Sequence, residues 1–176
     1  ENRQLLSQIL EGVESLATAI KELSGLSRTE RVNFGSRPDV VAGERFIERD
    51  EHEQLKALIT DPKRHRTVLL GMRGSGKTQL AASLAKQCED ANWNLVAWLN
   101  AESAQSLASN LAELARLLPI NTSDSPPQDL IVHRCLDHLK SAPPADRLIV
   151  LDNVENIDDL RGLIPSGNGL RVVATT

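Results

Sequence analysis

One eight-residue segment constrains the fold of this chain more than any other. Residues 71–78 read Gly-Met-Arg-Gly-Ser-Gly-Lys-Thr and match the pattern Gly-x-x-x-x-Gly-Lys-Thr/Ser at every defined position. The apolar run 67–70 precedes the segment, and an amphipathic stretch at 77–90 follows it. This context predicts a buried strand, a tight glycine-rich turn and a helix, in that order.

The residue types of this turn suit a polyphosphate. Glycines let main-chain amides approach an anion, and the start of the following helix adds free amides and a positive dipole end. We expect Lys77 to pair with the β- and γ-phosphates, and Thr78 to offer its hydroxyl to Mg²⁺. The sequence therefore predicts a P-loop. The predicted phosphate-binding residues are Gly71, Arg73, Gly74, Ser75, Gly76, Lys77, Thr78 and Gln79. For Arg73, a solvated side chain at the tip of the loop is the alternative.

An aspartate ends a later apolar run, at 147–152. Buried parallel strands end in the crevice where ligands bind, so we expect Asp152 to hold Mg²⁺ directly or through water. A carboxylate that only caps the next turn is the alternative. Many P-loop ATPases place a second acid at the following position, which here is Asn153; an amide can orient water but cannot take its proton. Glu155 could replace that acid or be a surface residue, and hydrolysis is expected to be slow.

Short apolar runs alternate with helical stretches along the rest of the chain. Strands are predicted at 67–70, 95–99, 147–152 and 170–174, and helices at 47–60, 77–90, 103–118, 128–141 and 156–163. Such alternation predicts a three-layer α/β/α fold around a parallel sheet. Because aromatic residues are only 2% of the chain, the core must be aliphatic.

The N-terminal part differs in character. Residues 1–24 predict an amphipathic helix with an apolar seam of about three heptads, which either oligomerises or packs on a neighbouring part of the protein. Residues 25–43, rich in Gly, Ser and Arg, are interpreted as a linker. Residues 44–176 are interpreted as a nucleotide-binding domain truncated at its C-terminal end.

Composition excludes some classes of protein. The net charge of −4 argues against a nucleic-acid footprint over the whole surface, and no apolar run has membrane length. Cys88 and Cys135 follow no metal-binding or redox spacing and are expected to be buried thiols. These features predict a cytoplasmic protein without a membrane segment.

The order of the motifs resembles a known family. The residues that carry the likeness are Gly-Lys-Thr-Gln-Leu-Ala (76–81), Trp-Leu-Asn-Ala-Glu-Ser (98–103), Asp-Asn-Val-Glu (152–155) and Thr-Thr (175–176). They are similar to the NB-ARC domain of the STAND class of signalling ATPases, over about residues 44–176.

That resemblance implies a switch in an NLR-like signalling protein, in which ATP or ADP controls self-association. It implies a sheet order 2-3-4-1 with the P-loop strand beside 170–174, and a fifth strand beyond this chain. It also implies nucleotide contacts from Phe46, Ile47, Arg49 and Thr176, although Glu48 stands where the family has glycine. For the first three, plain helix-start packing is the alternative. An upstream effector and downstream sensor repeats would complete such a protein.

Two other functions stay open on the sequence. One is an interaction module that binds nucleotide for stability and does not hydrolyse it. The other is a loader-type ATPase that acts on nucleic acid. Guanine specificity is disfavoured because no Asn/Thr-Lys-x-Asp segment of the GTPase type occurs.

Overall fold

The computed structural model describes residues 31–40, 54, 55, 57, 61, 65–120, 126–142 and 146–176. All of them belong to one unit, Arg31–Thr176. The helix predicted at 1–24 and the predicted adenine contacts Phe46, Ile47 and Arg49 lie outside the described residues, as does most of the helix predicted at 47–60.

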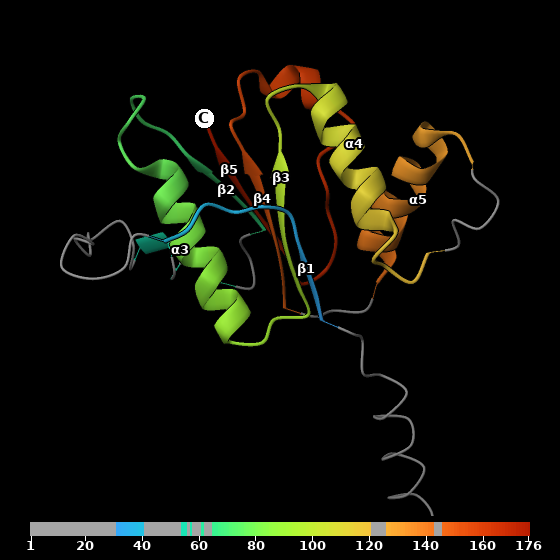
Figure 1. Cartoon of the computed structure of the whole chain (residues 1–176), viewed down its shortest axis with the longest axis horizontal. Helices are drawn as coiled ribbons and strands as arrows, with labels where there is room; N and C mark the ends of the chain where they lie inside the picture. The colour runs from blue at the N-terminus through green and yellow to red at the C-terminus, as the bar shows by residue number, and fades with distance from the viewer. Residues whose placement is uncertain are drawn as a thin grey trace, which may run out of the picture. The chain divides into compact units, whose positions relative to one another are not determined.

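A parallel sheet of five strands runs through the described part of the chain (Figure 1). Its order is β1-β3-β4-β5-β2. The strands are β1 (Val32–Phe34), β3 (Leu95–Asn100), β4 (Arg147–Asp152), β5 (Leu170–Thr175) and β2 (Arg66–Leu69). The three central strands are buried along almost their whole length, which is the pattern of a parallel sheet covered on both faces. The predicted α/β class with a parallel sheet is confirmed.

Helices cover both faces of this sheet (Figure 1). The helix α3 (Lys77–Asp90) packs against alternate residues of the central strands, among them Trp98 and Val150. The helices α4 (Ala104–Ala115) and α5 (Gln128–Ser141) cover the opposite face. Because strand side chains alternate between faces, each central strand contributes to both cores.

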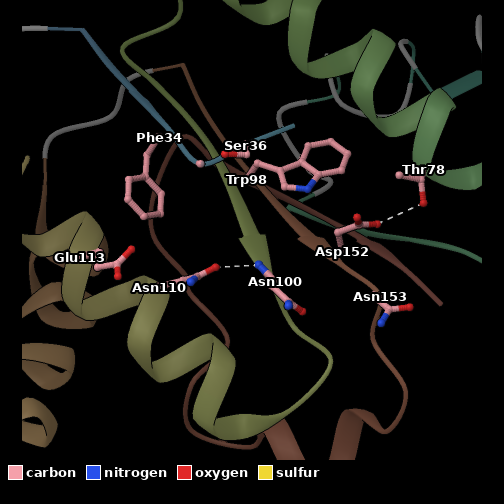
Figure 2. Close-up of a pocket in the computed structure, with 10 residues that line it drawn as sticks. Phe34, Ser36, Thr78, Trp98, Asn100, Asn110, Glu113, Asp152 and Asn153 are labelled. Atoms are coloured by element: carbon pink, nitrogen blue, oxygen red, sulfur yellow. Dashed lines mark hydrogen bonds between the residues drawn. The ribbon is translucent and has the colours of Figure 1, made fainter. Parts of the chain in front are cut away.

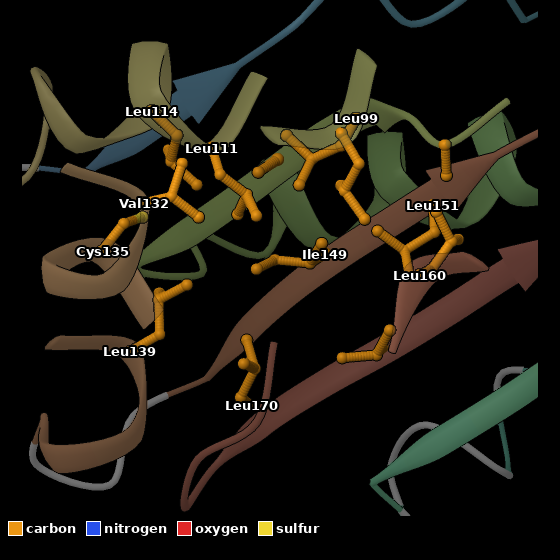
Figure 3. Close-up of a cluster of buried hydrophobic side chains, with 14 of the residues drawn as sticks. Leu99, Leu111, Leu114, Val132, Cys135, Leu139, Ile149, Leu151, Leu160 and Leu170 are labelled. Atoms are coloured by element: carbon orange, nitrogen blue, oxygen red, sulfur yellow. The ribbon is translucent and has the colours of Figure 1, made fainter. Parts of the chain in front are cut away.

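Leucine dominates the larger of the two cores (Figure 3). The side chains labelled there are Leu99, Leu111, Leu114, Val132, Cys135, Leu139, Ile149, Leu151, Leu160 and Leu170. The prediction of buried thiols is confirmed, since Cys135 lies in this core and Cys88 in the core under α3. Burial raises the pKa of both thiols to about 12, so they stay protonated at neutral pH.

Several predicted helix boundaries agree with the structure. The helices α3 and α5 cover the predicted ranges, and Ser103 caps α4 by accepting a hydrogen bond from the Ser106 amide at 3.1 Å. The α4 helix ends at Ala115 instead of at residue 118. The short helix predicted at 156–163 is a 3₁₀ turn, Ile157–Leu160.

The interpretation of residues 25–43 as a linker is wrong at 32–34, where the chain forms β1. This strand pairs in parallel with β3, with Phe34 opposite Ala97. The next residue, Gly35, has φ 88°, and a Cβ there would lie 2.0 Å from the Trp98 carbonyl oxygen. The close approach to β3 therefore requires glycine, and the sheet begins before the predicted domain boundary at residue 44.

Candidate functional site

The glycine-rich loop joins β2 to α3 at the carboxyl end of the sheet. Gly74 and Gly76 have φ of 83° and 87°, a region that side-chain-bearing residues rarely adopt. Gly76 is the N-cap of α3 and supplies no side-chain hydrogen bond to it. A Cβ on either glycine would meet no atom within 4 Å, so the loop presents main chain to open space. Such a surface suits an anion.

Lys77 is the first residue of α3. Its ammonium donates to the carbonyl oxygens of Gly71, at 2.7 Å, and Met72, at 2.9 Å. Both bonds are exposed to solvent. A phosphate oxygen is a stronger acceptor than a neutral carbonyl, so an anion on the loop can take over these bonds.

The other predicted phosphate-binding residues lie around the same loop. Arg73 is exposed at its tip, and the Ser75 amide donates to the Met72 carbonyl at 3.1 Å. The Gln79 side chain donates to the Asp39 carbonyl, at 3.3 Å, in the segment that follows β1.

Two threonine hydroxyls hold the Asp152 carboxylate. Thr78 donates to its Oδ1 atom from 3.2 Å, although 74 residues separate the two in the chain. Thr175 donates to the same atom from 2.6 Å, and the Asn153 amide donates to the Thr175 hydroxyl at 3.0 Å. These contacts join the loop, β4 and β5 at one point and orient the carboxylate.

Thr175 belongs to the Thr-Thr pair 175–176, but the sequence predicted no role for it at the site. It is 2% exposed, whereas Thr176 is exposed and donates to the Leu69 carbonyl at 3.4 Å. A signal was present in the sequence, because residue 175 shares a strand face with Val173, which packs on the α3 side. The polar residue at the end of β5 lies near Asp152 because β5 pairs with β4 in this register.

The chemistry of these oxygen atoms fits Mg²⁺. Magnesium takes octahedral oxygen ligands at about 2.0–2.1 Å, which puts neighbouring ligands about 3 Å apart. The Thr78 and Asp152 oxygens are 3.2 Å apart. Magnesium is commonly held by one or two carboxylates together with phosphate oxygens. Among the described residues there is no group of three or more His, Cys, Asp or Glu side chains that could hold a metal alone.

A cleft of about 820 Å³ begins at this pair of oxygens (Figure 2). Its polar lining consists of Ser36, Thr78, Asn100, Asn110, Glu113, Asp152 and Asn153. Phe34, Gly35 and Trp98 are the other described residues that line it. Residues 71–77 do not line the cleft, so cleft and loop meet at Thr78 and Asp152. None of the described residues that line the cleft is cationic.

The two residues proposed to serve hydrolysis lie differently. Asn153 lines the cleft and has φ 64°, a conformation that asparagine tolerates better than most residues. Glu155 is exposed and is not among the lining residues. The structure thus places an amide, and not this carboxylate, beside Asp152.

No family model matches this chain, and no curated protein matches it. The relation to the NB-ARC domain stays a prediction from the motifs. In the part of the chain that the structure describes, no helix is long and apolar enough to cross a membrane.

Proposed function

We propose that this chain is an ATP- and ADP-binding switch of the NB-ARC type that hydrolyses ATP slowly with Mg²⁺. The observation that carries the proposal is the contact between Thr78, at the end of the glycine-rich loop, and Asp152, 74 residues later. A loop that only turned the chain would not require a hydroxyl and a carboxylate side by side at its exit.

Each residue has a separate task in this proposal. The loop amides and Lys77 hold the phosphates, while Thr78 and Asp152 hold Mg²⁺. Magnesium, when bound, would neutralise charge on the phosphates. Thr175 keeps the carboxylate oriented through its 2.6 Å hydrogen bond.

The strand order supports the family assignment. Counting the glycine-loop strand β2 as the first, the order β3-β4-β5-β2 is 2-3-4-1, with β1 added beside β3. The proposal includes a cytoplasmic location and self-association governed by the bound nucleotide. Sedimentation of the protein with ATP and with ADP tests the second point.

Calorimetry of ATP and ADP binding tests nucleotide binding itself. Lys77→Ala removes the two charge-assisted hydrogen bonds that the ammonium would donate to the phosphates. We therefore expect roughly 100-fold weaker nucleotide binding. Lys86→Ala is the matched control, because Lys86 lies on the same helix and pairs with Asp90 at the exposed surface. Equal affinity of the Lys77 variant and the wild type would refute the phosphate assignment.

A second candidate function is nucleotide binding without turnover. The amide of Asn153 beside Asp152 favours it, since an amide cannot accept the proton of an attacking water. Phosphate release measured with Lys77→Ala as the blank separates the two candidates. Release indistinguishable from that blank would leave only the non-hydrolysing module.

A further inference from the structure

Asn100 belongs to the segment 98–103, for which the sequence alone predicts no role at the site. It is the last residue of β3, and in the register of the sheet it lies directly opposite Asp152. Neighbouring strands are about 4.8 Å apart, and opposite residues of a parallel pair point to the same face. The Asn100 amide therefore belongs beside the Asp152 carboxylate, and both line the cleft (Figure 2).

Two hydrogen bonds hold Asn100 in place. Its main-chain amide donates to Asn110 Oδ1 at 2.8 Å, and its own Oδ1 accepts from the Glu102 amide at 3.0 Å. With Oδ1 engaged, the Nδ2 group is the free end, and it has no hydrogen-bond partner among the described residues. A side chain fixed at one end with unused donors at the other is suited to hold a small polar molecule.

The cleft lies on the attacking side of the proposed phosphate site. A nucleophile reaches the terminal phosphorus in line with, and opposite to, the leaving group. The leaving diphosphate would lie over residues 71–77, which do not line the cleft. The cleft meets that loop at Thr78, whose hydroxyl contacts Asp152, so an attacking water would approach through the cleft and past Asn100.

We propose that Asn100 orients the attacking water, an inference that rests on the proposed function. Nδ2 donates to one lone pair of the water and leaves the other facing the γ-phosphorus. The water oxygen bonds to phosphorus, the bond to the bridging oxygen breaks, and its electron pair stays on ADP. The released proton passes through a phosphate oxygen to solvent. Asn100 and Asn153, which line the cleft beside Asp152, carry amides and cannot accept this proton.

The test compares two complexes of ADP by thermal shift. ADP with aluminium fluoride and Mg²⁺ imitates the flat transition state with its in-line water, and ADP with beryllium fluoride imitates the bound triphosphate. We expect Asn100→Ala to lose the stabilisation by the first complex and to keep that by the second. Phosphate release should fall roughly tenfold, as for the loss of one hydrogen bond.

Glu113→Gln is the matched control, because Glu113 lines the same cleft beside Asn110, away from Thr78 (Figure 2). It should respond to both complexes like the wild type. If Asn100→Ala responds to both complexes like the wild type, the inference is wrong. If the wild type responds to neither complex and binds no ATP, the proposed function itself fails.

Asn100→Asp tests the same position by gain of activity. The change keeps the shape of the side chain and the acceptor for the Glu102 amide, and it adds a carboxylate next to Asp152. A carboxylate oxygen at this position can accept a proton from the water, which an amide cannot do. We expect phosphate release to rise about tenfold or more. Unchanged or lower release would contradict a position of residue 100 beside the attacking water.

Discussion

The carboxyl edge of the sheet has two halves that are built in different ways. The phosphate half is one continuous loop, residues 71–78, whose pattern is visible in the sequence. The cleft half draws its lining from β1, β3, β4 and α4 and from the residues that follow β1 and β4. A continuous loop can be recognised from spacing alone, whereas a cleft exists only once the strands are in register.

Two glycines show the same difference between the cleft half and the phosphate half. Gly35, in the cleft half, and Gly76, in the phosphate half, both have positive φ. A Cβ on Gly35 would overlap the Trp98 carbonyl, but one on Gly76 would meet nothing within 4 Å. The first glycine serves packing, and the second leaves room above the loop.

The largest effect should come from Gly35→Ala. The change combines left-handed backbone strain with the overlap at Trp98, so we expect a loss of about 3–5 kcal/mol of unfolding free energy. Gly162→Ala is the control, because Gly162 has φ 82° and no atom within 4 Å of its Cβ position; it should lose about 1 kcal/mol. Urea denaturation measures both. Equal losses of unfolding free energy in the two variants would mean that the close contact with Trp98 adds nothing to the cost of Gly35→Ala.

A smaller effect is expected from Thr175→Val, which keeps the shape and removes the hydroxyl. The Asn153 amide loses its acceptor and Asp152 loses a donor, at a cost of about 2 kcal/mol in stability. The gain in ATP affinity on adding Mg²⁺ should be smaller than in the wild type but larger than in Asp152→Ala. The comparison is made by calorimetry with and without Mg²⁺.

Thr176→Val is the control for the loss of stability, since Thr176 is exposed and donates to the Leu69 carbonyl at 3.4 Å. It should leave the free energy of unfolding almost unchanged. A larger effect from Thr176 than from Thr175 would reverse the assignment of the two threonines.

The smallest effect concerns the segment that follows β1. Arg37 donates through Nε and Nη2 to the two carboxylate oxygens of Glu89, at 3.2 and 2.8 Å, and so ties this segment to α3. A double-mutant cycle with Arg37→Ala and Glu89→Ala should give a coupling of about 0.2–1 kcal/mol that falls with added salt. A salt-independent coupling would contradict an electrostatic origin.

Regular elements were predictable where local pattern and burial agree. The bounds of α3 and α5 and the cap at Ser103 followed from periodicity and residue type. The strand β1 was not predictable, because three residues beside a glycine carry no periodic signal. Its strand conformation depends on pairing with Leu95 and Ala97, more than 60 residues away.

The candidate site divides in the same way. The sequence predicted the loop and the carboxylate at the end of β4, and the fold brings them together. Thr175 and Asn100 were missed because their roles depend on which residues lie opposite Asp152 in the sheet. The order of the strands and their register decide that, and neither is a local property.

By itself the sequence determined the segments whose conformation depends only on the residues within them. The loop conformation requires glycines, helix bounds follow caps and apolar spacing, and buried strands require apolar runs. The tertiary structure alone decided which side chains meet at the carboxyl edge, where the cleft opens and that β1 joins the sheet. The physical reason is range, since backbone angles and capping act within a few residues, whereas strand pairing joins residues far apart in the chain.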